Sequence, residues 1–121
     1  PEGHEHNWYN YIVRFDMAAL GHVDDADAFR GKIVRAMQAE GMDTNVWQQF
    51  ILPAMTVFQA QTRRLGLALE QYPVAQKHCD WHTCILTPLR APNGPEAINL
   101  TAAAVRKVMA NIGQLESLPE E

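Results

Sequence analysis

Two histidines and two cysteines, all potential metal ligands or catalytic groups, lie close together in the stretch HCDWHTC. His78 and His82 are four residues apart, so on a helix both side chains would leave one face and could share a metal ion. Zinc needs at least a third protein ligand, and Cys79 would point about a quarter-turn away. His78 also falls on the apolar stripe of the expected helix, which favours a packed histidine. We therefore predict no metal site. His78 and His82 are the candidate ligands if the chain does bind a metal ion.

A catalytic nucleophile with its base is equally hard to assemble. Ser117 is the single serine and falls in the expected tail, so serine-based acyl transfer has no candidate. Cys84 and His82 are two residues apart across an expected helix–strand junction, where their side chains would seldom face each other. The sequence has no G-x-G-x-x-G or Walker-type phosphate loop. It therefore predicts no catalytic residue.

A possible binding cleft is indicated by aromatic and polar residues that follow an expected strand. Trp47 and Gln48 leave the strand end, and Pro53 and Met55 come shortly afterwards. Such residues could line a substrate pocket. A core tryptophan beside solvated glutamines is the simpler interpretation of the same residues, and both interpretations stay open at this point.

Composition limits the class of protein. A chain of 121 residues fits one domain, here 1–121. A formal net charge of −4 argues against nucleic acid as a partner, because phosphate binding needs clustered lysine and arginine. Apolar runs fall short of the ~20 residues that cross a bilayer, so we expect no membrane span. Two cysteines are too few for a disulfide framework, and we expect a cytoplasmic protein with reduced thiols.

The first third of the chain predicts a strand, a helix and a second strand. Residues 7–16 alternate in polarity, which is typical of a strand with one buried face, formed by Tyr9, Tyr11, Val13 and Phe15. A helix should follow from about residue 23, where Asp24 and Asp25 suit the helix start, to Gly41. Its apolar stripe is formed by Phe29, Ile33, Val34 and Met37. Residues 43–50 should be extended.

The remainder continues the alternation. We expect a short helix over 56–65, a loop over 67–72, a helix over 73–83 whose Val74, His78 and Trp81 share a face, and a strand over 84–87. Residues 90–99 carry turn residues, Thr101 caps a last helix, and residues 115–121 form a frayed tail. The order β-α-β-α-α-β-α predicts a two-layer α+β domain with helices on one face of a small sheet.

A family resemblance covers nearly the whole chain. It rests on HNWYNYIVRFD, DAFRGKIVRAMQAEGMDTNVW, LPAMTVFQ, YPVAQKHCDWHTCILTPL and LTAAAVRKVMANI, in this order and spacing. Together these segments resemble the C-terminal small domain of the DegT/DnrJ-type sugar aminotransferases, which are fold type I enzymes that use pyridoxal 5′-phosphate. The resemblance implies a small, mainly antiparallel sheet, a substrate cleft for a sugar or nucleotide-sugar, and contacts with other subunits.

The same resemblance implies that the chemistry lies outside this chain. In that family the Schiff-base lysine and the phosphate-binding residues belong to the large N-terminal domain, and Lys32, Lys77 and Lys107 match no family lysine motif. Pro53 and Ala54 also stand where the family often has a histidine. We therefore expect no cofactor bound by this chain alone and no transaminase activity from it.

Two hypotheses follow from these observations. The chain is either the substrate-facing part of an aminotransferase-like protein, or a free-standing small binding or self-associating domain without catalytic activity, the product of a truncated gene. In the first case its partner is the large domain of the same enzyme or a second copy. Removal from a large domain would expose an apolar face, so we expect the 121-residue chain to self-associate.

Overall fold

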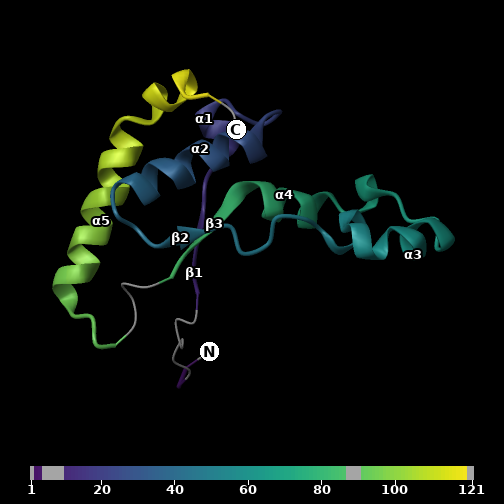
Figure 1. Cartoon of the computed structure of the whole chain (residues 1–121), viewed down its shortest axis with the longest axis horizontal. Helices are drawn as coiled ribbons and strands as arrows, with labels where there is room; N and C mark the ends of the chain where they lie inside the picture. Colours follow the sequence, from purple (N-terminus) through teal and green to yellow (C-terminus); the bar gives the residue numbers. More distant parts are fainter. Residues whose placement is uncertain (1, 4–9, 87–90, 120–121) are drawn as a thin grey trace.

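The sheet at the centre of the protein is small and antiparallel. The computed structural model describes residues 2–3, 10–86 and 91–119. Within them, strands β1 (Tyr11–Arg14), β2 (Thr44–Asn45) and β3 (His82–Ile85) pair in the order β1-β3-β2 (Figure 1). Both outer strands run antiparallel to β3, with Tyr11 and Thr44 opposite Ile85. The α+β class and the antiparallel sheet are therefore confirmed.

Helices connect the strands and follow the last of them. The α-helices are α1 (Met17–Leu20), α2 (Ala26–Ala39), α3 (Gln59–Arg64), α4 (Pro73–Trp81) and α5 (Pro95–Ala110). Shorter 3-10 turns span Leu52–Ala54, Thr56–Phe58, Leu69–Gln71 and Ile112–Ser117. α1 and the 3-10 turns add to the predicted order, and the order of strands and longer helices is as the sequence predicted.

Helix α2 forms as its sequence pattern predicted. All four residues of the expected stripe, Phe29, Ile33, Val34 and Met37, are buried. The helix ends before Gly41, which adopts a left-handed conformation with φ of 82°. Glycine takes this conformation at little steric cost, so the chain can turn back towards β2.

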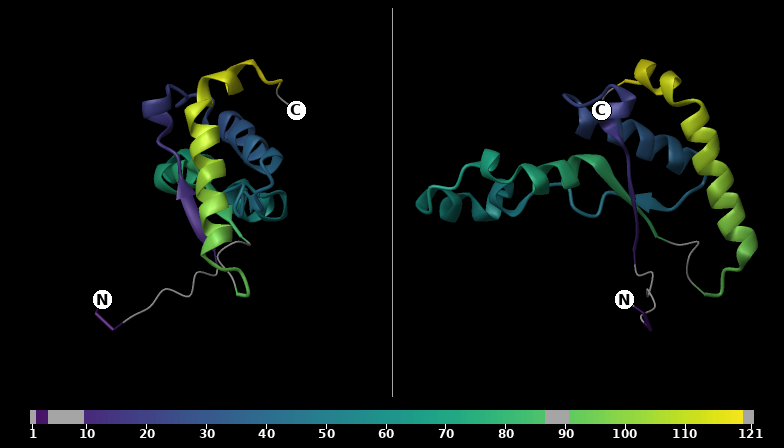
Figure 2. Two further views of the ribbon diagram at one scale, coloured as in Figure 1. Left: turned by 90° about the vertical axis from the view of Figure 1, so that its left-hand side faces the viewer. Right: turned by 180° about the vertical axis from the view of Figure 1, so that it is seen from behind.

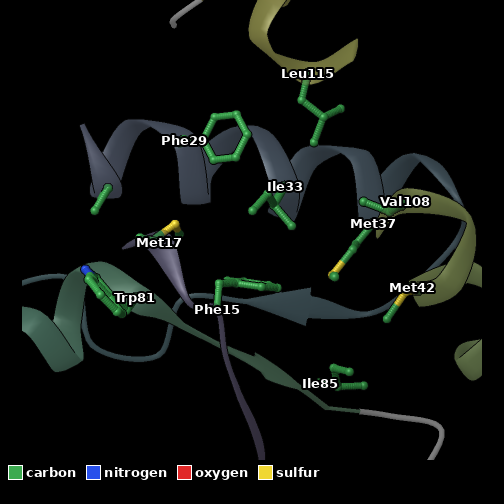
Figure 3. Close-up of a cluster of buried hydrophobic side chains, with 11 residues drawn as sticks. Phe15, Met17, Phe29, Ile33, Met37, Met42, Trp81, Ile85, Val108 and Leu115 are labelled. Carbon is green, nitrogen blue, oxygen red and sulfur yellow. The ribbon is translucent and has the colours of Figure 1, made fainter. Parts of the chain in front are cut away.

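The hydrophobic core lies between α2 and one face of the sheet. Figure 3 shows Phe29, Ile33 and Met37 pointing from α2 towards Phe15 and other residues of the strand layer. The other buried members of the cluster come from helices, strands and turns along the whole chain: Met17, Ala26, Met42, Trp81, Ile85, Val108 and Leu115. Helix α5 packs beside α2, and both helices therefore cover the same side of the sheet.

A long excursion follows β2, projects away from this body and returns through the first turn of α4. We call residues 46–76 the arm. Figures 1 and 2 show it extending sideways, with α3 near its far end. The hydroxyl of Thr62 in α3 donates to the carbonyl of Pro53 at 3.2 Å. This hydrogen bond ties α3 to the part of the arm that precedes it, which we call the outgoing leg; the part that follows α3 is the return leg. All residues of the arm are described, and Ile51 alone among them is buried.

Three predicted boundaries in this region are corrected. The stretch 43–50 was expected to be extended, but Thr44–Asn45 is its only paired part among the described residues. Helix α4 ends at Trp81 and β3 begins at His82, two residues earlier than predicted, because Arg14 of β1 pairs with His82. The face of α4 is also different. His78 and Val74 are exposed, whereas Cys79 and Trp81 are buried.

The C-terminal part differs from the prediction in two respects. α5 begins at Pro95 rather than at Thr101, since proline suits the first helical position, and the Thr101 hydroxyl donates to the Ala97 carbonyl at 2.9 Å. The predicted frayed tail is ordered through the 3-10 turn Ile112–Ser117, where Leu115 is buried in the core. Residues 120–121 lie outside the described part, as do Tyr9 and Thr87 from the predicted strands.

The C-terminal turn is held by two cations of α2. The Lys32 ammonium donates to the Glu116 carbonyl at 3.2 Å, and the Arg35 guanidinium donates to the Pro119 carbonyl at 2.9 Å. Each hydrogen bond joins residues that are 84 positions apart in sequence. The local composition of residues 115–121 therefore could not predict that the turn is folded against α2.

Candidate functional site

A groove of about 850 Å³ runs between the two legs of the arm. Residues of both legs and of α4 line it: Gln48, Ile51, Leu52, Pro53, Gln71, Tyr72, Pro73, Val74, Ala75, His78 and Cys79. Two of the four predicted cleft residues, Gln48 and Pro53, are therefore brought together. Trp47 and Met55 lie on the same leg but are not part of this lining.

Trp47 is on the surface. Its side chain is 61% exposed, so the alternative interpretation of a core tryptophan is wrong. The Trp47 backbone hydrogen-bonds the buried thiol of Cys84 in β3, which fixes the start of the arm against the sheet. The arm therefore presents an exposed indole at the residue that precedes Gln48 in sequence.

The base of the arm is anchored by a buried arginine. Arg30 of α2 is 5% exposed, and its guanidinium donates both to the carbonyl of Cys79 in α4 and to the carboxylate of Asp27. The Nε of Arg30 has no partner among the described residues. Because a buried guanidinium bridges two helices, the direction in which α4 leaves the body is set by α2.

The two candidate metal-binding histidines stack on each other instead of converging on an ion. Their ring centroids are 4.3 Å apart with an interplanar angle of 15°. His82 is buried, and its Nδ1 donates to the His78 carbonyl, so this nitrogen is not available to a metal. Burial lowers the pKa of His82 from its ordinary value of 6.5. Within the described ranges, no group of three or more potential ligands could hold a metal ion.

The two thiols are poor nucleophiles. Cys79 and Cys84 are both buried and free. Burial raises the pKa of each thiol from its usual 9.0, and the Asp80 carboxylate raises that of Cys79 further. Since the thiolate is the reactive form, neither cysteine is suited to covalent catalysis near neutral pH.

The lysines of this chain do not fit a Schiff-base site. The Lys32 ammonium donates to the Glu116 carbonyl, and Lys107 forms an ion pair with Glu40 at 2.7 Å. The Lys77 ammonium lies 3.8 Å from the centroid of the Trp81 ring, in a cation–π contact. None of these three lysines is among the residues that line the arm groove.

The arm carries much exposed apolar surface, of which the cleft prediction from the sequence included only Trp47. Its exposed large apolar side chains are Trp47, Phe50, Leu52, Val57, Phe58, Leu65, Leu69 and Val74. Val74 at the groove is 83% exposed. Exposed apolar side chains that gather on one surface usually mark a binding interface, and the arm concentrates eight of them within residues 46–76. The groove residues from 71–75 were missed because they lie at a loop–helix junction, where no periodicity identifies a shared face.

The comparisons with known proteins add no relative. No protein-family model and no curated protein matches the sequence. In the described ranges, no helix combines the length and apolarity needed to cross a bilayer.

Proposed function

We propose that this chain is the C-terminal small domain of a pyridoxal-phosphate-dependent sugar aminotransferase-like protein. In this proposal it lines one side of a substrate cleft and makes contacts with neighbouring subunits, and the catalytic lysine belongs to another part of the protein. The α+β order of elements and the segments that carry the family resemblance support the proposal.

The arm supports the proposal most directly, through its groove and its exposed apolar side chains. Its groove is lined by Gln48 and Pro53, and its apolar side chains are left uncovered in the isolated chain. An isolated domain gains nothing from exposing so much apolar surface, whereas a domain that faces a second protein surface would bury it. The exposed indole of Trp47 and the amide of Gln48 are groups able to contact a sugar ring and its hydroxyls.

The second candidate function is a free-standing domain that binds its own copies. The same exposed arm favours it, because a self-associating domain also needs an uncovered apolar surface. We place either form in the cytoplasm, a location supported by the two buried free thiols, which persist where the surroundings are reducing.

The intact mass of the natural protein tests the proposal. An aminotransferase-like protein would give a mass several times 13.6 kDa, with a Schiff-base lysine in the preceding residues. A natural product of about 13.6 kDa would overturn the proposal and favour the second candidate. Adding pyridoxal phosphate to the 121-residue chain should produce no absorbance band of an internal aldimine, and such a band would contradict the assignment of the lysine to another domain.

A further inference from the structure

We infer that the arm docks on the body of a second copy of this chain, so that two copies exchange arms. The inference deepens the binding role proposed above and does not depend on the aminotransferase assignment. It rests on the charges of the arm and the body, on the exposed apolar residues of both, and on the direction in which the arm points.

The arm and the body carry opposite charge. The arm contains Arg63, Arg64 and a single acidic residue, Glu70, so its net charge is positive. Thirteen of the chain's 14 acidic residues lie outside the arm, together with eight of its 10 basic residues. The arginine pair forms the last turn of α3 and has no ion-pair partner among the described residues. Opposite potentials on two surfaces favour their association.

The body offers a surface that complements the tip of the arm. In the turn that leads into α2, Val23 is exposed and is followed by Asp24, whose carboxylate has no partner within the described residues. At the tip of the arm, the arginine pair is followed by exposed Leu65. Each surface therefore combines an exposed apolar side chain with charges of one sign, and the signs are opposite.

The arm cannot make this contact within its own chain. Figures 1 and 2 show α3 near the far end of the arm, well separated from the start of α2, which lies in the body. Contact between Arg64 and Asp24 therefore requires two copies. A two-fold arrangement would form the contact twice, since each copy supplies one arm and one receiving surface.

Sedimentation velocity over a range of protein concentrations tests the inference. We expect a dimer that dissociates on dilution and is weakened by added salt. Arg64→Glu should raise the dissociation constant at least tenfold. Arg106→Glu is the matched control, because Arg106 is an exposed arginine on α5 and the charge change is identical, and it should shift the constant less than threefold. Circular dichroism of each variant establishes that it is folded.

A pair of complementary variants makes the test specific. Asp24→Arg should also weaken the dimer, because two like charges then meet at both contacts. A mixture of Arg64→Glu with Asp24→Arg should dimerise as well as the unmodified chain, since one contact is restored with swapped charges and the other is unmodified. If Asp24→Arg impairs folding, Asp24→Asn replaces it, and its mixture with Arg64→Glu should then recover part of the dimer.

Three results would overturn the inference. These are a monomer at every concentration, an equal effect of Arg64→Glu and Arg106→Glu, and a mixture that associates no better than its components. The first would leave another protein surface as the partner of the arm. None of these results bears on the mass of the natural protein, so failure of this inference is distinguishable from failure of the proposed function.

Discussion

Removal of the Arg30 side chain should loosen the base of the arm and destabilise the whole protein. Arg30→Ala deletes the donor to the Cys79 carbonyl in a buried position. An unpaired buried acceptor costs about 1–3 kcal/mol. The two buried methylenes beyond Cβ contribute about 0.8 kcal/mol each. Loss of the unpaired Nε offsets part of this cost. We therefore expect the free energy of unfolding to fall by about 3 kcal/mol.

Urea unfolding at a low, fixed protein concentration measures this change. With a slope near 2 kcal/mol/M, a loss of about 3 kcal/mol lowers the midpoint by about 1.5 M. Arg30→Met keeps the apolar stem and removes the unpaired Nε, so it should cost only about 1 kcal/mol. Arg106→Ala, on the exposed surface of α5, should change the free energy of unfolding by less than about 0.5 kcal/mol.

The ranking of these variants by free energy of unfolding shows whether Arg30 anchors the arm. If Arg30→Ala is as stable as Arg106→Ala, the guanidinium does not connect α2 to α4, and our account of how the arm is anchored is wrong. If Arg30→Met costs as much as Arg30→Ala, the packing of the stem contributes nothing and the magnitude is wrong.

Three further predictions concern backbone, pH and thiols. Gly41→Ala should lower the free energy of unfolding by about 1 kcal/mol because φ is +82°, whereas Gly113→Ala, where no positive φ is required and nothing crowds a Cβ, should be close to neutral in urea titrations. Since burial lowers the pKa of His82 in the folded state below its ordinary value of 6.5, the unfolded state binds a proton at a higher pH than the folded state does. The urea midpoint should therefore drop between pH 7 and pH 5, and a flat profile would refute the assignment. Cys79 and Cys84 should react with Ellman's reagent at pH 8 only at the rate of unfolding, so a fast reaction in native buffer would contradict their burial.

Helix α2 was predictable from the sequence because local signals agree there. The spacing of Phe29, Ile33 and Met37 identifies the buried face, and Gly41 supplies the left-handed residue at the end. The antiparallel sheet was likewise expected from the resemblance. In these parts local pattern and tertiary packing favour the same structure, which is when sequence reasoning succeeds.

The remaining features depend on contacts between distant residues. β3 begins at His82 because Arg14 lies opposite it, and nothing within the HCDWHTC stretch specifies that register. Leu115 is buried because Lys32 and Arg35 hold the C-terminal turn from α2. The spacing of two histidines likewise cannot say whether their rings stack or converge on an ion.

The candidate site was predictable only in part. Gln48 and Pro53 were singled out as a polar and a rigid residue after a strand, and both line the groove. The opposite wall, with Tyr72 and Val74, was missed because these residues lie 19 to 26 positions after Pro53 and Gln48 in sequence. Whether an apolar residue such as Trp47 is covered also depends on a second surface, which the pattern of one chain does not describe.

If a second copy of this chain covers the arm, as we infer, the arm is shielded from solvent only when two copies associate. Amide hydrogen exchange of the 121-residue chain at increasing protein concentration tests this inference most directly. Our account predicts that amides of the arm, residues 46–76, gain protection as the concentration rises, whereas amides at the centre of α2 are already protected in the monomer. Arm amides that exchange at the same fast rate at every concentration would contradict it.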